Sequence, residues 1–201
     1  MSMGLKDFYR EPLPNIGLFA KMRSGKDEVY KVISFMGFNV ERVAFGDIMK
    51  ERFYELFPLI PPEPKPISEL VAFGQSMRAI DNDVWVRPTM ARMKVRTDIL
   101  AQAGFTPPAF IVTDIRQPNE YEACKRAGMV MVKVHADESV RVERMLALGE
   151  KVSREVLDSP TELHIDGFKP DYVINNNGTP QELAKEITEL IYKIQTKRND
   201  V

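Results

Sequence analysis

The stretch AKMRSGKD, residues 20–27, contains the residues whose types and spacing most directly suggest chemistry. It keeps the spacing of the phosphate-binding pattern G-x-x-x-x-G-K-[ST] between an apolar stretch and an amphipathic one. Backbone N–H groups from about Met22 to Asp27 would surround a phosphate, and Lys26 would reach the β- and γ-phosphates of a nucleotide. The predicted nucleotide-binding residues are Lys21, Met22, Arg23, Ser24, Gly25, Lys26, Asp27 and Glu28.

Two residues depart from that pattern. Ala20 replaces the first glycine, which costs little if its φ angle is negative. Asp27 replaces the hydroxyl residue, and its carboxylate at about 4 Å would repel a phosphate by roughly 1 kcal/mol in water, or about 4 kcal/mol at an effective dielectric constant of about 20. We therefore expect Asp27 to act on Mg²⁺, directly or through its water shell. The alternative is an acidic residue favoured in the first turn of a helix.

A second group of charged residues follows the apolar run in FIVTDIRQPNE, residues 110–120. Asp114 ends the predicted strand, in the position of a carboxylate that acts on a metal ion or a substrate. The alternative for Asp114 is a cap for the next helix. Arg116 is suited to a bidentate grip on a phosphate group, so we expect it to bind substrate and to take part in catalysis.

Further candidates lie in RAIDNDVWV, residues 78–86. We expect Arg78, Asp81 and Trp85, together with Asp47, to contact an acceptor substrate. Trp85 has the alternative of anchoring the core through its large apolar surface.

Three arginines lie in the charged stretch that begins at residue 137. Arg141, Arg144 and Arg154 would belong to a mobile lid that closes over a transferring phosphoryl group, where positive charge stabilises the transition state. The alternative is pairing with neighbouring acids on the surface. The two histidines have no second ligand at metal spacing, and Cys124 has no basic partner, so we predict structural roles for all three.

Composition narrows the class of partner. The 28 Lys and Arg residues nearly balance the 29 Asp and Glu residues, so no excess charge favours nucleic acid or an anionic membrane. No apolar run has the length that spans a bilayer, and the first residues lack an apolar signal segment. The single Cys124 excludes an internal disulfide. We expect a cytoplasmic protein that binds small molecules.

Alternating apolar and amphipathic stretches predict an α/β fold, with a parallel sheet covered by helices on both faces. Ligands bind beyond the carboxyl ends of such strands, where the phosphate-binding loop and Asp114 would both lie. The proline-rich residues 58–66 mark a subdomain edge, and a helical region interrupted near Pro88 follows them. We expect residues 1–14 to form a surface leader, and His164 to lie in a loop.

Four stretches together resemble the deoxynucleoside monophosphate kinases of tailed bacteriophages, a branch of the P-loop kinases. They are RSGKD (23–27), RAIDNDVWV (78–86), VTDIRQPNEYE (112–122) and DYVINNNGT (171–179), and they occur in family order. In that family Asp is usual in the position of the hydroxyl residue, which favours a working phosphate site. This sequence departs from the family at Ala20 and at Glu28, where threonine is common.

The resemblance implies a single P-loop kinase domain over residues 1–201, with a P-loop NTPase-like parallel sheet between two layers of helices. Its core would cover about 15–57 and 104–201, with a helical acceptor-binding insertion at about 58–103 and a lid at about 137–168. The implied reaction is phosphoryl transfer from ATP, with Mg²⁺, to a deoxynucleoside monophosphate.

The resemblance also implies roles for single residues. Lys26 would bind the ATP phosphates, and Arg78 and Arg116 would hold the acceptor monophosphate. Asp114 would lie beside the metal ion or the acceptor. Asn177, in NNNGT, would lie near the adenine ring. The arginines that would act on the transferring phosphoryl group are Arg141, Arg144 and Arg154.

Other functions remain open at this point. Phosphomevalonate kinase has a similar S-G-K-D loop, and dephospho-CoA kinase ends in a similar D-x-V-I-x-N-x-G segment, so a related small-molecule kinase is one alternative. A regulator that binds nucleotide without turnover is another. The sequence does not identify the acceptor base or the oligomeric state, although an amphipathic helix rich in Met and Phe is compatible with a homodimer.

Overall fold

The computed structural model describes residues 11–199, so the leader expected over residues 1–14 lies mostly outside the described residues. Within this range one sheet of five parallel strands has the order β2-β3-β1-β4-β5. The strands are β1 (Ile16–Phe19), β2 (Val40–Val43), β3 (Ala109–Ile115), β4 (Val130–His135) and β5 (Tyr172–Asn175). The central strand β1 is buried along its whole length, because its apolar side chains are covered on both faces of the sheet.

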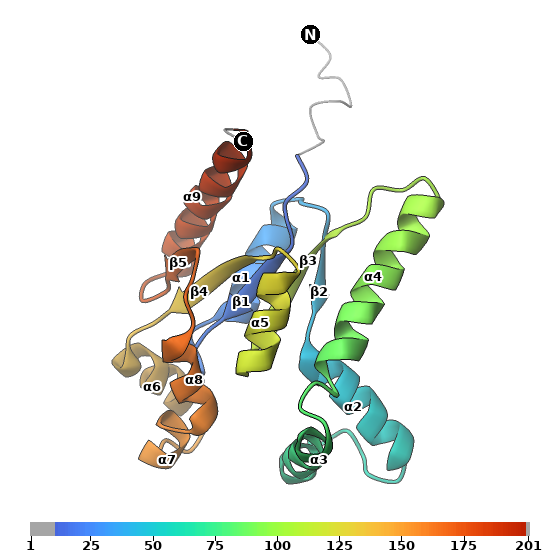
Figure 1. Ribbon diagram of the computed structural model, residues 1–201. Helices are drawn as coiled ribbons and strands as arrows, with labels where there is room; N and C mark the ends of the chain where they lie inside the picture. The colour runs from blue at the N-terminus through green and yellow to red at the C-terminus, as the bar shows by residue number, and fades with distance from the viewer. Residues whose placement is uncertain (1–10, 200–201) are drawn as a thin grey trace.

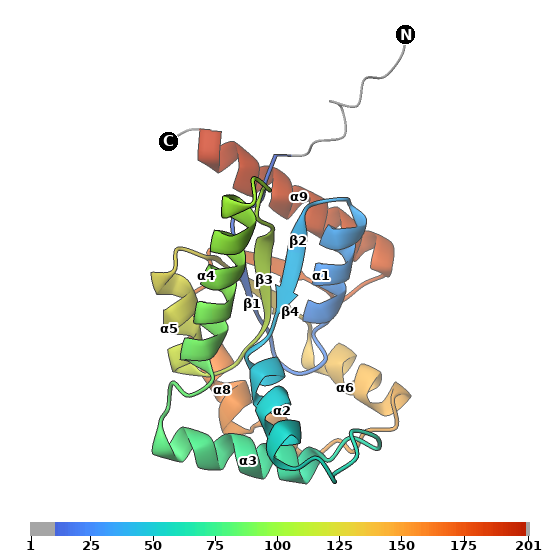
Figure 2. The ribbon, with the colours of Figure 1, turned by 90° about the vertical axis from the view of Figure 1, so that its right-hand side faces the viewer.

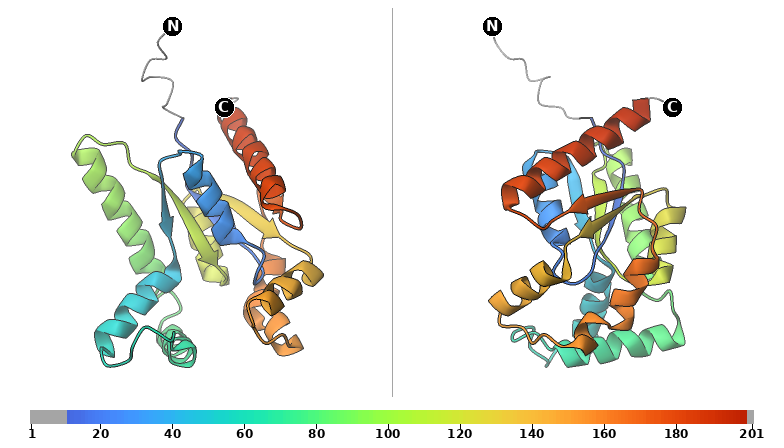
Figure 3. Two further views of the ribbon diagram at one scale, coloured as in Figure 1. Left: turned by 180° about the vertical axis from the view of Figure 1, so that it is seen from behind. Right: turned by 90° about the vertical axis from the view of Figure 1, so that its left-hand side faces the viewer.

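Helices cover both faces of this sheet and make three layers. On one face α1 (Lys26–Phe35) and α9 (Pro180–Asn199) pack against the sheet, and Figure 3 shows them on the same side. On the other face lie α4 (Val86–Gln102) and α5 (Pro118–Arg126), so Figure 2 shows α4 and α1 on opposite sides of the strands. The predicted α/β fold is confirmed.

Two groups of helices lie beyond the carboxyl ends of the strands (Figure 1). One group consists of α2 (Phe45–Leu56) and α3 (Ile67–Ile80). The other consists of α6 (Glu138–Ala147), α7 (Arg154–Leu157) and α8 (Pro160–Gly167). Between the two groups lies the end of the sheet where ligands bind in folds of this kind.

The structure corrects three local predictions. The break in the helical region lies at residues 81–85. Pro88 lies in the first turn of α4, where a backbone N–H has no partner within the helix, so the missing N–H of proline costs no hydrogen bond. His164 lies in α8 and not in a loop. The strand predicted to end at Asp114 continues to Ile115, whose side chain is buried.

Other features agree with the sequence. Thr179 caps α9 and accepts a hydrogen bond from the N–H of Glu182, while the Glu182 carboxylate accepts from the N–H of Thr179. Cys124 is buried, and burial raises the pKa of its thiol to about 12, which suits a packing role. Among the described residues, no helix combines the length and the apolar character that crossing a membrane requires.

Candidate active site

The phosphate-binding loop joins β1 to α1, and two of its residues have a left-handed backbone conformation. Arg23 has a φ angle of 63° and Gly25 one of 90°. Gly25 also has no room for a side chain, because an added Cβ would overlap the Nδ2 atom of Asn176. Arg23 is the one non-glycine residue with positive φ among residues 11–199, so Ala20 has the negative φ that its methyl group tolerates.

The loop presents free backbone donors. The N–H of Ser24 donates to the carbonyl of Lys21 at 3.2 Å, and the N–H of Met22 donates to Glu162. Four other N–H groups of the loop and the first turn of α1 have no hydrogen-bond partner within residues 11–199, those of Arg23, Gly25, Lys26 and Asp27. Unpaired N–H groups at a helix N-terminus are ready to bind an anion. The sequence predicts that N–H groups from Met22 to Asp27 bind phosphate. In the structure four of them, those of Arg23, Gly25, Lys26 and Asp27, are available to do so.

Lys26 and Arg116 add two cations to this end of the sheet. The side chain of Lys26 is 18% exposed, and its Nζ atom lies 3.8 Å from the Asp27 carboxylate. Burial lowers the pKa of Lys26, Asp27 opposes the shift, and the nearby positive charge of Arg116 lowers the pKa further. The guanidinium of Arg116 is half-buried and has no hydrogen bond or ion pair with another residue between 11 and 199. Lys26 thus has one long ion pair, with the largely exposed Asp27, and Arg116 has none among the described residues.

The two carboxylates predicted to act on a metal ion have different surroundings. Asp27 has a side chain that is 59% exposed, with Lys26 as its ion-pair partner. Asp114 is partly buried, and its two oxygens accept from the N–H groups of Phe45 and Gly46, each at 2.8 Å. Asp114 thus caps α2, and not the next helix of the chain. Among the described residues, no cluster of three or more His, Cys, Asp or Glu side chains could hold a metal ion by itself.

Glu120, a buried acid, links the side chain of Arg78 to the backbone of Arg116. The Nη2 atom of Arg78 lies 3.3 Å from Glu120 Oε1, while Glu120 Oε2 accepts from the N–H groups of Arg116 and Gln117. Burial raises the pKa of Glu120, and the negative charge of Asp114 raises it further. Glu120 therefore joins the end of β3 to the last turn of α3, from which Arg78 comes.

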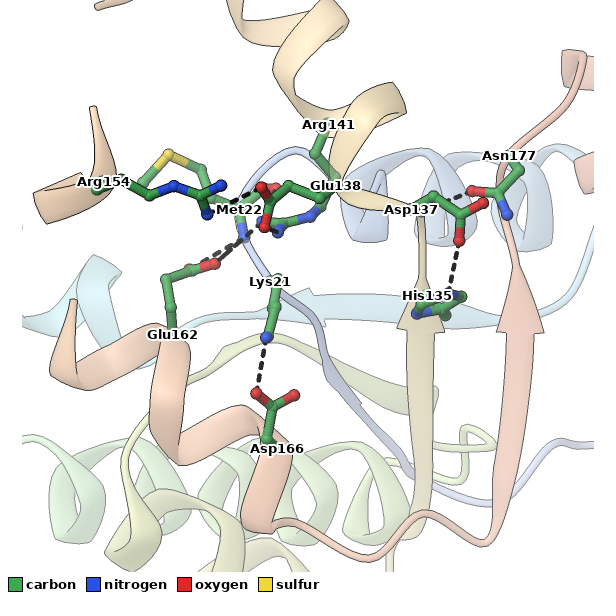
Figure 4. Close-up of polar contacts among 10 residues, drawn as sticks. All are labelled: Lys21, Met22, His135, Asp137, Glu138, Arg141, Arg154, Glu162, Asp166 and Asn177. Carbon is green, nitrogen blue, oxygen red and sulfur yellow. Dashed lines mark hydrogen bonds and ion pairs between the residues drawn. The ribbon is translucent and has the colours of Figure 1, made fainter. Parts of the chain in front are cut away.

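The lid arginines divide into two kinds, and Figure 4 shows one of each kind, Arg141 and Arg154. Arg141 is buried and donates to Glu162 at 3.3 Å and to the carbonyl of Met22 at 3.4 Å. Arg144 donates to the carbonyl of Arg23 at 3.1 Å. Arg154 is instead 74% exposed and pairs with Glu138 at 3.0 Å. Two of the three arginines thus brace the phosphate-binding loop from outside.

The other predicted site residues lie farther from the loop or use their polar groups elsewhere. Asp47 is bonded to Arg42 and Lys50. Asp81 accepts from the N–H of Asp83 and pairs with Arg87 in the turn between α3 and α4. Trp85 is 3% exposed and donates its indole N–H to the carbonyl of Gly74, which is the placement of a core anchor.

Two more predicted nucleotide contacts point away from the loop. Glu28 pairs with Lys31 on the exposed face of α1. Asn177 accepts from the N–H of Asp137 at 2.7 Å (Figure 4). The preceding residue, Asn176, is the one that reaches the loop, because its side chain donates to the carbonyl of Ser24 at 2.9 Å.

The sequence analysis did not predict several residues that contact the phosphate-binding loop. Three acids from the segment between α6 and the end of α8 contact three successive loop residues: Asp166 contacts Lys21, Glu162 contacts Met22, and Glu150 contacts Arg23. Glu162 and Asp166 are four residues apart and share one face of α8, a spacing visible in the sequence. No pattern in the sequence indicates that this face of α8 contacts the phosphate-binding loop.

Comparison with known proteins supports the fold. No protein-family model matches the sequence, and no curated protein sequence matches it. Dephospho-CoA kinase from Campylobacter jejuni has a TM-score of 0.55 at 16% identity, over 92% of this chain and 98% of that one. Shikimate kinase from Bacteroides thetaiotaomicron has a TM-score of 0.51 at 15% identity, over 92% and 99%. A Thermus thermophilus protein has a TM-score of 0.56 at 20% identity, over 91% and 98%. The chain therefore has the α/β fold of P-loop kinases.

Proposed function

We propose that the protein is a kinase that transfers the terminal phosphoryl group of ATP to a small phosphorylated acceptor, a deoxynucleoside monophosphate. The observation that carries this proposal is the set of four unpaired N–H groups beside Lys26 and Arg116. Two cations and four unpaired N–H donors match the terminal phosphates of a nucleotide in charge and in hydrogen bonding. Solved kinases with the same fold support phosphoryl transfer as the reaction class.

The proposed reaction converts ATP and the monophosphate into ADP and the diphosphate. An acceptor phosphate oxygen forms a bond to the γ-phosphorus, and the bond between that phosphorus and the β–γ bridging oxygen breaks. In this proposal Lys26 and the loop donors hold the ATP phosphates, while Arg116 and Arg78 hold the acceptor phosphate. Holding both reactants in line and neutralising their charge is most of what phosphoryl transfer requires of a protein.

Asp27 is the carboxylate that best fits a role at Mg²⁺. It lies next to Lys26 and is largely exposed, so its oxygens are open to a metal ion or its water shell. Both oxygens of Asp114 already accept hydrogen bonds from α2, so it fits a direct ligand role less well. When bound, Mg²⁺ would neutralise the phosphates and the repulsion from Asp27.

Other acceptors and a regulator without turnover are the alternatives to a deoxynucleoside monophosphate. The similarity to dephospho-CoA kinase in fold makes that acceptor the nearest rival. The test is ADP release from MgATP with each of the four deoxynucleoside monophosphates, dephospho-CoA and phosphomevalonate. We expect turnover with at least one deoxynucleoside monophosphate, at a rate of about 1 to 100 per second, which is typical of kinases. Turnover with dephospho-CoA or phosphomevalonate alone would contradict the acceptor, and no turnover with any of them would contradict the kinase.

A further inference from the structure

Glu162, in α8, is a buried acid that contacts the phosphate-binding loop from outside. Its side chain is 3% exposed, and its Oε1 and Oε2 atoms accept from the N–H of Met22 at 3.0 and 2.9 Å (Figure 4). A buried carboxylate is costly unless donors and an opposite charge surround it. Here the Met22 N–H is the donor and Arg141 is the opposite charge. The stability of the ion pair therefore depends on the position of Met22 in the loop.

The same ion pair holds both backbone polar groups of Met22. Glu162 accepts from its N–H, and Arg141 donates to its carbonyl. Arg144 then donates to the carbonyl of Arg23, the next residue. The unpaired N–H groups of the phosphate-binding loop begin at this same residue, Arg23.

The backbone of Arg23 needs such support. Its φ angle of 63° is left-handed, which costs free energy for a residue with a Cβ atom. A strained conformation of this kind persists where the surrounding contacts over-determine it. Arg141 and Arg144, both in α6, donate to the carbonyls of Met22 and Arg23 and so hold the two peptides that flank Arg23. Glu162 holds the preceding peptide through the Met22 N–H and pairs with Arg141.

We propose that Glu162 is a positioning residue for nucleotide binding, which holds the Met22 peptide so that the following N–H groups face the phosphates. This role rests on the proposed function, because the phosphates concerned are those of ATP. Glu162 acts through Met22 and Arg141 and does not itself touch the nucleotide. Removing it would weaken binding of the phosphates by leaving the loop free to relax.

Asp166 provides a matched control on the same face of α8. It pairs with Lys21 at 2.7 Å, one residue before Met22, but the two side chains are 29% and 52% exposed. Lys21 makes this contact through its side chain, so the pair does not fix a loop peptide. An exposed pair of this kind contributes little.

The experiment compares Glu162→Ala, Glu162→Gln and Asp166→Asn with the wild type. Calorimetry gives the Kd for MgATP, and hydrogen exchange reports the peptide that contains Met22 and Arg23. We expect Glu162→Ala to raise the Kd about tenfold or more, and Asp166→Asn to change it less than about twofold. Glu162→Gln is expected to fall between them, because its amide oxygen still accepts from Met22 but no longer pairs with a charged Arg141 as a carboxylate does.

Each outcome decides the role. The positioning role of Glu162 is supported if both Glu162 variants show faster hydrogen exchange at the loop and a raised Kd for MgATP. If Glu162→Ala does not fold, the same two readings on Glu162→Gln decide. An unchanged Kd despite faster exchange overturns the role of Glu162 while leaving the proposed kinase intact. A folded wild type that binds no MgATP contradicts the proposed function, and the positioning role with it.

Discussion

Lys26 carries a mostly buried positive charge, which favours binding of an anion at the expense of the stability of the folded protein. Its side chain is mostly buried, and burial is the main cause of its lowered pKa. An ammonium group that is largely held away from water costs free energy in the folded protein, and the long ion pair with Asp27, at 3.8 Å, offsets only part of this cost. A terminal phosphate placed beside Lys26 would add negative charge there, so more of the cost would be recovered when nucleotide binds.

Replacing Lys26 should therefore separate activity from stability. We expect Lys26→Met to lower kcat by about 100-fold or more, because a donor to the transferring group is lost. The melting temperature should stay the same or rise, because the buried charge is removed. Steady-state kinetics and thermal unfolding measure the two effects.

The control for this prediction is Lys31→Met. Lys31 lies farther along α1 and pairs with Glu28 on the exposed face, so its loss should leave kcat unchanged. A turnover rate in Lys26→Met close to that of the wild type would show that the loop does not hold the reacting phosphates.

At the level of elements, Asp114 joins the end of β3 to the start of α2. Its carboxylate accepts the N–H groups of Gly46 and Phe45, which are among the unsatisfied donors of the helix N-terminus. Burial raises the pKa of Asp114, and the two backbone donors oppose the shift. The folded protein therefore takes up a proton at Asp114 more readily than the unfolded chain does.

The sign of this shift predicts a pH dependence. An acid with a raised pKa in the folded state gives stability that is present below its unfolded pKa and lost as the pH rises through its folded pKa. The stability advantage of the wild type over Asp114→Asn should thus shrink as the pH rises above about 4, the ordinary pKa of an aspartate. Chemical denaturation of both proteins at several pH values measures it.

Asp81 gives the opposite case as a control. Its pKa is lowered, mainly by its hydrogen bond with Arg87, so the advantage of wild type over Asp81→Asn should grow as the pH rises. The same slope in both comparisons would contradict the assignment of the effect to Asp114.

The elements and the loop could be predicted from the sequence because their signals are local. The spacing of SGKD after an apolar run and the alternation of strands with helices each depend on neighbouring residues. The contact of Glu162 with Met22 joins residues 140 positions apart, and no local pattern encodes it. For the same reason the sequence did not show that Arg141 and Arg144, which we expect in a lid over the substrate, also donate to carbonyls of the phosphate-binding loop.

At the scale of the whole molecule, distant segments meet at the phosphate-binding loop. The loop after β5 contributes Asn176, α6 contributes Arg144, and α8 contributes Glu162, all of them more than 100 residues along the chain from the loop. Figure 1 shows α6 and α8 on one side of this end of the sheet and α2 with α3 on the other. These contacts thereby fix the shape of the phosphate-binding loop, and the N–H groups of Arg23, Gly25, Lys26 and Asp27 keep no partner within residues 11–199.

The backbone amide signals of the loop test this account most directly. In a ¹⁵N-labelled protein titrated with a non-hydrolysable MgATP analogue, the N–H signals of Arg23, Gly25, Lys26 and Asp27 should shift most, since they lack partners in the free protein. The signal of Met22 should move little, because it stays bonded to Glu162. Shifts that leave those four signals in place and fall elsewhere in the protein would contradict the claim that this loop binds the nucleotide phosphates.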